Sequence, residues 1–404
     1  MPFDDLSRPK LRPGVDVGKF PQTPDGYVSI YDRTLLSRTV LNVTPPDEWK
    51  ILIYLMDGTR TLIDICREFE RAGDESLVID MLAGLVARLD QCLFLEGPAF
   101  DAHYGALLEH YRSLPARPVL DKGPFWQDGK LAGLLDEILA EATPVESTGR
   151  MVGLIAPHLD YARGRPCYAE VYARLAARTP PARIVVLGTN HSPRALTPMA
   201  TGRDYETPLG RTRTDVEFIE RLEARCGDLR GCELDHAREH SVELQVAWCQ
   251  HLFGADRFTL VPILCTDPTV AHPGAEDCVD AGEVGRALRD LLASDGKDTL
   301  VIAGADLSHV GQTFGDDRRL DAKFLDEVRQ RDMAVLEHVR ANDAGAFVGA
   351  FVGDNNPTKV CSVGCIHMLM TALPGACAEV IDYHQAVDRQ TQTGVTCAAA
   401  VFTR

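Results

Sequence analysis

The feature that most constrains the fold is a regular alternation between short apolar runs and longer amphipathic stretches, which extends from about residue 117 to the C-terminus. The runs are rich in Val and Ile, and stretches with helical spacing, such as SVELQVAWCQHLF, lie between most of them. This alternation predicts an α/β domain with a largely buried sheet. The expected strands are VGLIAP (152–157), RIVVLG (183–188), FTLVPILC (258–265), TLVIAGA (299–305), AEVIDYH (378–384) and VTCAAAVF (395–402).

Length and charge narrow the function classes. The chain has 404 residues, a length that predicts two or three domains, and its formal net charge is −17. This acidic balance argues against a broad nucleic-acid interface and against docking on anionic lipid. The N-terminus has no apolar signal segment, and no apolar run approaches the roughly 18 to 20 residues of a membrane span. We therefore expect a cytoplasmic protein with no membrane partner, in which the 12 cysteines are reduced thiols.

The region before residue 117 has a different texture. Residues 1–25 are rich in proline, glycine and charge, and we expect a tail there. Residues 26–97 predict a small winged-helix-like unit, and residues 98–116 a linker with one short helix at Ala102–Tyr111. The expected elements of the unit are a hairpin at 26–44, a helix at 45–57, a helix after Thr61, a helix at 75–91 and a strand at Cys92–Leu95.

Polar side chains follow three of the expected strands. His158 comes after the first run, His191 after the second, and Asp306 and His309 after TLVIAGA. In open α/β sheets the ligand crevice lies beyond the carboxyl ends of the strands. One histidine in such a place is more often a loop residue with a local hydrogen bond, but three strand ends together predict a metal or catalytic site.

Two further segments bring chemistry of the same kind. Glu239 and His240 stand at the start of an expected helix, although the spacing is not that of the two-histidine helical zinc motif. Cys361 precedes an apolar helical run, and the positive end of a helix dipole favours the thiolate that binds metals. The alternative for Cys361 is a small buried apolar residue, which is what most free cysteines are.

An ordered set of motifs carries a family resemblance over residues 117–404. APHLDYARG, VVLGTNHS, EHSVELQ, GADLSHVG and the Cys361 segment together resemble the Memo family, known in bacteria as AmmeMemoRadiSam system protein B. The family fold is similar to that of class III extradiol dioxygenases, an α/β sheet that holds a non-haem iron. The resemblance implies that the metal ligands are His158, His191 and Cys361.

The resemblance also implies pocket roles, which we assign as catalytic, for His240, Asp306 and His309. Two departures affect the substrate contacts that could be carried over from relatives. Asp160 stands where many relatives have glycine, and CSVGC, which begins at Cys361, stands where many have CGRHP.

Residues 26–97 resemble the PqqD-like fold, which is known for binding peptide precursors and partner enzymes of radical SAM systems. The resemblance rests on LNVTPPDEWKILIYLMDGTRTLIDI and on the helix after it. It implies a radical SAM partner protein. The alternative is a small packing domain without a ligand. DNA is not expected, because the segment 74–91 carries four acidic residues against one arginine.

The ligand set leaves three hypotheses open. Two imidazoles and a thiolate suit Fe(II), which we expect first, and also copper or zinc, and three protein ligands leave a coordination position open. The first hypothesis is a metal-dependent redox enzyme that uses dioxygen on a small molecule or modified peptide. His240 or His309 would then move a proton, and Asp306 or Glu239 would orient a ligand imidazole.

The second hypothesis is a non-catalytic binding protein, in which the pocket holds a metal or a ligand and the N-terminal unit recruits a partner. The third, a zinc hydrolase, is disfavoured because no carboxylate that could position a nucleophile occurs at motif spacing.

Overall fold

The computed structural model describes residues 4, 6–18, 23–43, 52–71, 78–120, 126, 129–143, 149–192, 196–270 and 279–404. The chain divides into two compact units. The smaller is formed mainly by Met1–His110 and the larger by Tyr111–His191 and Ala195–Arg404. Each unit has hydrophobic clusters of its own.

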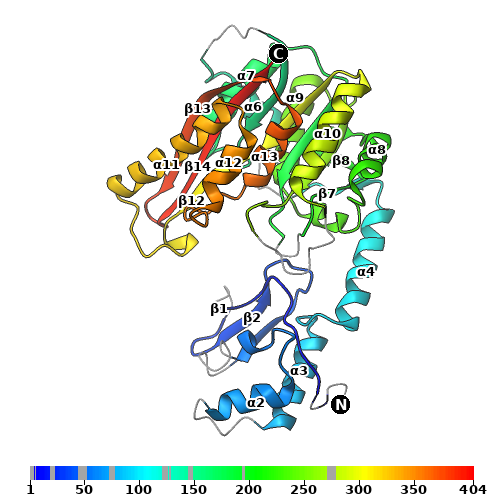
Figure 1. Ribbon diagram of the computed structural model, residues 1–404, viewed down its shortest axis with the longest axis vertical. Helices are drawn as coiled ribbons and strands as arrows, with labels where there is room; N and C mark the ends of the chain where they lie inside the picture. The colour runs from blue at the N-terminus through cyan, green and yellow to red at the C-terminus, as the bar shows by residue number, and fades with distance from the viewer. Residues whose placement is uncertain are drawn as a thin grey trace. The chain divides into compact units, whose positions relative to one another are not determined.

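In the N-terminal unit a small antiparallel sheet packs with α2 (Leu62–Arg71) and α3 (Ile79–Gln91) (Figure 1). Its strands lie in the order β1 (Val15–Gly18), β2 (Val28–Asp32) and β3 (Val40–Val43), so the hairpin predicted for 26–44 is confirmed. The helices α2 and α3 turn their apolar faces toward the sheet. Fully buried Ile30, Leu62 and Val86 belong to one cluster, which is the core of this unit.

The tail predicted for residues 1–25 is wrong at Val15–Gly18, because β1 pairs with β2 along these four residues. Arg12 explains why this segment is fixed. Its guanidinium is buried and lies 2.6 Å from an Asp32 carboxylate oxygen, while its Nε donates to the Leu93 carbonyl at 2.6 Å. A buried charge needs such partners, so this arginine ties the segment to the unit.

Three further expectations differ from the structure or lie outside it. The strand expected at Cys92–Leu95 forms only an isolated bridge between Leu95 and Leu11. The short linker helix is longer than expected, since α4 spans Pro98–Ser113. The start of the helix expected at 45–57 lies outside the described residues.

The larger unit is built on an eight-stranded sheet in which all six expected strands are present. The order is β12-β14-β5-β11-β6-β10-β7, with β13 paired to β14. Four central strands are parallel: β5 (Met151–Ala156), β11 (Thr299–Gly304), β6 (Arg183–Thr189) and β10 (Thr259–Cys265). The others are β7 (Met199–Ala200), β12 (Asp306–Val310), β13 (Cys377–Asp388) and β14 (Thr393–Thr403).

Helices cover both faces of this sheet (Figure 1). Side chains alternate along β6, so Val185 and Leu187 join the cluster on one face and Ile184 and Val186 the cluster on the other. The first face carries α8 (Val216–Cys226), α10 (Ala281–Asp295), α11 (Ala322–Arg340), α12 (Ala344–Val352) and α13 (Val363–Ala372). The second carries α6 (Leu131–Leu139), α7 (Arg165–Ala176) and α9 (Ser241–Phe253).

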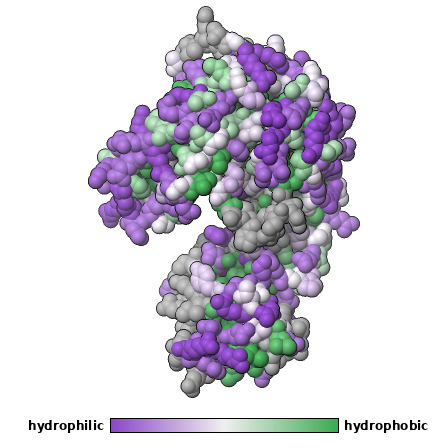
Figure 2. All heavy atoms as spheres, in the orientation of Figure 1, coloured by the Kyte–Doolittle hydropathy of each residue, from purple (hydrophilic) through white to green (hydrophobic). Residues whose placement is uncertain are grey.

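Smaller elements complete the larger unit. A three-stranded sheet contains β4 (Ala116–Arg117), β8 (Asp204–Thr207) and β9 (Gly210–Thr212). The described residues also include the short 3-10 helices η1 (Glu233–Ala237) and η2 (Gln312–Phe314). Figure 2 shows mainly hydrophilic side chains over α11 and over α8 and α10, as outer faces of amphipathic helices require. Among the described residues, no helix has the length and apolar character needed to cross a membrane.

Candidate metal centre

Three of the predicted site residues meet at one end of the sheet. His158 follows β5, His191 follows β6, and Cys361 lies two residues before α13. One ligand atom from each lies within 4.8 Å of the others, and His158 Nε2 is 3.5 Å from Cys361 Sγ. The structure thus brings together the three residues to which the resemblance assigns a metal.

The surroundings of His158 decide which of its nitrogens faces the thiol. The side chain is buried, and its Nδ1 lies 2.9 Å from the carbonyl oxygen of Gly304, the last residue of β11. A carbonyl can only accept, so Nδ1 carries a proton, and Nε2 is the nitrogen that offers a lone pair when the imidazole is neutral. That lone pair is on the side of Cys361, as a metal-ligating imidazole requires.

His191 is oriented in the same sense by a carboxylate. Its Nδ1 lies 2.9 Å from Glu239 Oε2, which leaves Nε2 for a metal. Glu239 is buried, and its Oε1 accepts from the backbone N–H of Ser241 at 2.9 Å. Burial by itself would raise the pKa of the Glu239 carboxyl, but the charge and hydrogen bond of His191 hold that pKa well below its usual value.

Two glycines allow the start of α9 to approach the strand ends closely enough for these contacts. A Cβ on Gly188 of β6 would lie 2.5 Å from Ser241 Oγ, and one on Gly304 of β11 would lie 2.6 Å from the Ser241 carbonyl oxygen. Any larger residue at either place would displace the helix start, and with it Glu239. The glycines therefore help to set the position of the His191 partner.

Cys361 has the electrostatic surroundings of a metal ligand. Burial would raise the pKa of its thiol, but the neighbouring His158 and His191 lower that pKa well below the usual range. The interaction between Cys361 and His158 also shifts the pKa of His158. Burial would lower the pKa of His158, whereas Asp306 and Cys361 raise it to about 10. Without a metal, the site thus favours a thiolate beside a protonated imidazole.

Asp306 lies beside the cluster but in a different element from the one expected. The segment after β11 continues as strand β12, antiparallel to β14, so Asp306 belongs to a strand and not to a loop beyond a strand end. Its Oδ1 accepts from the backbone N–H groups of His158 and Leu159 at 3.0 and 3.2 Å. Asp306 therefore fixes the turn that carries His158, and its Oδ2 also lies 3.5 Å from His158 Nε2. Glu239, by contrast, holds the His191 imidazole by Nδ1.

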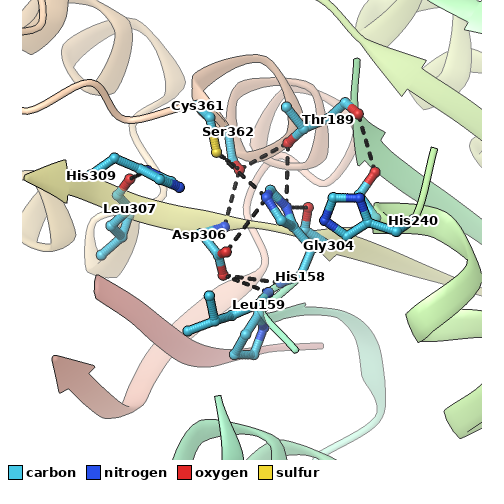
Figure 3. Close-up of polar contacts among 12 residues, drawn as sticks. His158, Leu159, Thr189, His240, Gly304, Asp306, Leu307, His309, Cys361 and Ser362 are labelled. Atoms are coloured by element: carbon cyan, nitrogen blue, oxygen red, sulfur yellow. Dashed lines mark hydrogen bonds and ion pairs between the residues drawn. The ribbon is translucent and has the colours of Figure 1, made fainter. Parts of the chain in front are cut away.

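The two remaining predicted histidines lie on opposite sides of the cluster (Figure 3). The ring of His240 stacks on that of His191 at 5.3 Å, and His191, Glu239 and His240 form a second group with ligand atoms within 4.8 Å of one another. His309, also in β12, has its Nδ1 3.0 Å from the Leu307 carbonyl. Figure 3 shows His309 on the other side of the cluster from His240. In the described chain His309 is in neither group of ligand atoms.

The sequence interpretation missed three residues that complete the surroundings. Ser362 Oγ lies 3.3 Å from Cys361 Sγ, and Thr189 Oγ1 lies 2.9 Å from Ser362 Oγ (Figure 3). Both could have been suspected, since Thr189 ends β6 and Ser362 adjoins Cys361. The carbonyl of Gly304 has no signature in a sequence, because every residue type carries one.

Comparison with known proteins gives a consistent result. The family described as Memo-like protein matches residues 123–401. A MEMO1 family protein of Methanopyrus kandleri is 29% identical over 214 residues, which are 52% of this chain and 67% of that protein. One from Thermus thermophilus is 30% identical over 250 residues, with coverage of 62% and 71%.

A third relative matches more of the chain. A MEMO1 family protein of Aquifex aeolicus is 24% identical over 365 residues, which are 88% of this chain and 91% of that protein. A match of this extent necessarily reaches into the region before residue 123. The ordered motifs, the α/β unit and the matched region 123–401 agree, and the chain belongs to the Memo-like family.

Proposed function

We propose that the protein binds a redox-active transition metal, Fe(II) first and copper as the alternative, and uses it in oxidation–reduction chemistry. The observation that supports this most strongly is the orientation of the two imidazoles. Each has its Nδ1 engaged, by the Gly304 carbonyl and by Glu239, and a ligand atom of each lies within 4.8 Å of Cys361 Sγ. Three electron-pair donors gathered in this way repel one another unless a proton or a metal ion lies between them.

The donor set fits the proposed metals by its chemistry. Imidazole nitrogens suit Fe, Cu and Zn, and a thiolate adds the negative charge that holds a divalent ion. Three protein ligands leave at least one position for a further ligand. When bound, iron or copper would supply one-electron chemistry that no side chain of the site can provide. Zinc would bind the same atoms without redox chemistry, so metal identity decides between an oxidoreductase and a binding protein.

The protein residues have separate tasks in this proposal. Glu239 holds His191 in its ligating orientation, and Asp306 holds the backbone turn of His158. His240 and His309 are the candidates for proton transfer to or from a substrate, since they lie beside the ligands. The side chain of His191 is 40% exposed, which is consistent with access for a small molecule or modified peptide from that side.

Oxygen uptake tests the redox proposal. Protein purified without an affinity tag and analysed for metals should contain iron or copper near one equivalent. Anaerobically prepared, iron-loaded protein should then consume dioxygen faster than free iron in the same buffer, and the variant Cys361→Ala should not. Iron that binds tightly without any such uptake, with each candidate substrate tried, would favour the non-catalytic binding protein.

We further propose that the N-terminal unit recruits a partner protein of a radical SAM system. Two observations support a separate role. The unit has its own apolar core, and the Aquifex relative matches part of the region before residue 123. A chain that lacks residues 1–110 should keep its metal content but lose binding to a purified radical SAM enzyme in a pull-down. A truncated chain that loses metal would show that the two units depend on one another, and undiminished binding would exclude recruitment by this unit.

A further inference from the structure

Ser362 lies at the centre of a buried group of polar atoms directly behind the proposed ligand thiol. Its side chain is fully buried and it is the residue that precedes α13. Three atoms surround its hydroxyl oxygen: the backbone nitrogen of Asp306 at 3.0 Å, Thr189 Oγ1 at 2.9 Å and Cys361 Sγ at 3.3 Å (Figure 3). None of these contacts was anticipated by the motif comparison, in which CSVGC was only a departure.

The donors and acceptors around Ser362 give these contacts a direction. The backbone N–H of Asp306 can only donate, so Ser362 Oγ accepts from it. A thiolate that binds a metal has no proton and can only accept, so the contact with Cys361 Sγ requires Ser362 to donate its single hydroxyl proton there. The remaining lone pair of Ser362 Oγ is then free to accept from Thr189.

The contacts of Thr189 on its other side are consistent with Thr189 donating to Ser362. Thr189 Oγ1 lies 3.4 Å from Cys365 Sγ, which can donate to it as a thiol. Burial raises the pKa of the Cys365 thiol well above its usual value, so Cys365 keeps its proton. His158 Nδ1 does not compete, because it donates to Gly304. Each proton thus makes one hydrogen bond: the Cys365 thiol donates to Thr189, Thr189 donates to Ser362, and Ser362 donates to the Cys361 thiolate.

We propose that Ser362 is a positioning residue that donates a hydrogen bond to the Cys361 thiolate and thereby weakens electron donation from sulfur to the bound metal. This inference rests on the proposed function. A hydrogen bond to a ligand sulfur draws charge from it, which disfavours the oxidised metal and raises its reduction potential. In thiolate-ligated metal sites generally, hydrogen bonds to the sulfur tune the reduction potential of the metal. Thr189 supports the effect because its hydrogen bond holds the Ser362 hydroxyl in one orientation.

Cobalt(II) is the probe, because it does not change oxidation state under argon and gives a sulfur-to-metal charge-transfer band when a thiolate binds. Full-length protein should show this band at saturation with cobalt. In Ser362→Ala the band should move to longer wavelength, since a sulfur without its hydrogen bond gives up electron density more easily. Ser362→Thr keeps the hydroxyl and should restore the parent position.

A second pair of variants covers the case in which Ser362→Ala does not fold. Thr189→Val keeps the shape but not the hydroxyl and should give a smaller shift in the same direction, whereas Thr189→Ser should give none. A band that stays in place in Ser362→Ala, or in Thr189→Val where Ser362→Ala does not fold, would overturn the inference and leave Ser362 a structural cap. The absence of any thiolate band in the parent would instead overturn the proposed metal site.

Discussion

The two ends of strand β6 differ in how their charged or polar groups are paired. At its start, buried Arg183 is paired with Asp215 at 2.9 Å and with Asp295 at 2.5 Å, and its guanidinium lies 4.0 Å from the centre of the Phe218 ring. Beyond its other end, His191 turns a nitrogen toward a group formed with His158 and Cys361. At the first end a positive charge meets negative ones, and at the second, electron-pair donors meet one another.

This difference separates a structural network from a functional site. The arginine network is complete as it stands, because each ion has a partner of opposite sign. The donors at the other end are complete only with a proton or a metal ion between them, although their supporting groups are already in place. Substitutions at the two ends should therefore separate metal binding from stability, with effects on bound metal that range from nearly complete loss to none.

The largest effect is expected at Cys361. The variant Cys361→Ala should lose most of its metal, because removal of the only anionic ligand leaves two neutral imidazoles. Cys249→Ala is the matched control, since Cys249 is a buried thiol of α9 that is not among the grouped ligand atoms. Metal per folded protein, measured by mass spectrometry of the elements, decides the comparison. Equal metal in both variants would mean that the thiol is not a ligand.

A partial effect is expected at Glu239. Glu239→Ala should weaken metal affinity by about 10- to 100-fold, the usual cost of removing a partner that orients a ligand imidazole. Glu239→Gln keeps an acceptor oxygen for His191 Nδ1 and should lose less. Competition with a coloured chelator measures both. If the glutamine variant is as weak as the alanine variant, the carboxylate acts through its charge and not through orientation.

Substitution of His240 or His309 is expected to lower turnover without loss of metal. Each alanine variant should bind metal like the parent and consume oxygen more slowly, by roughly 10²- to 10⁴-fold if it moves a proton. Activity must be expressed per folded, metal-loaded molecule. A lowered melting temperature with unchanged turnover would assign both histidines to the fold. Metal lost from His240→Ala would instead make the second group, with His191 and Glu239, part of the centre.

The other end of β6 should respond in the opposite way. Arg183→Met removes the buried partner that Asp215 and Asp295 share. Breaking a buried pair costs about 3–5 kcal/mol of unfolding free energy, and this is an upper limit here, because Asp295 keeps Arg221 and Asp215 keeps Lys297. Urea unfolding should register this loss, while metal per folded molecule stays at the parent level. A coupled loss of metal would show that the two ends of the strand are not independent.

The sequence predicted those features of the two strand ends that follow from periodicity and strand order. All six expected strands formed, because runs such as RIVVLG are buried on both faces and have no other stable setting. Parallel strands bring their carboxyl ends to one edge of the sheet. The places of His158 and His191 just after two expected strands therefore predict that both lie at that edge, although β11 lies between β5 and β6.

The parts that the sequence did not predict depend on contacts between distant segments. The strand β1 is only four residues long and lies in a region rich in proline and glycine. The ion pair between Arg12 and Asp32 holds this segment in place. The continuation of β11 into β12 depends on pairing with β14 and has no local signature. The orienting role of the Gly304 carbonyl and the hydroxyl of Ser362 likewise appear only when strands and helices are placed in space.

The central claim is that His158, His191 and Cys361 bind one metal ion. X-ray absorption spectroscopy of the iron-loaded protein tests it most directly, because sulfur and nitrogen neighbours are distinguished by distance and scattering. The account predicts one sulfur at about 2.3 Å and at least two nitrogen or oxygen neighbours at about 2.0–2.2 Å, with the sulfur absent in Cys361→Ala. An iron shell without sulfur in the parent protein would contradict it.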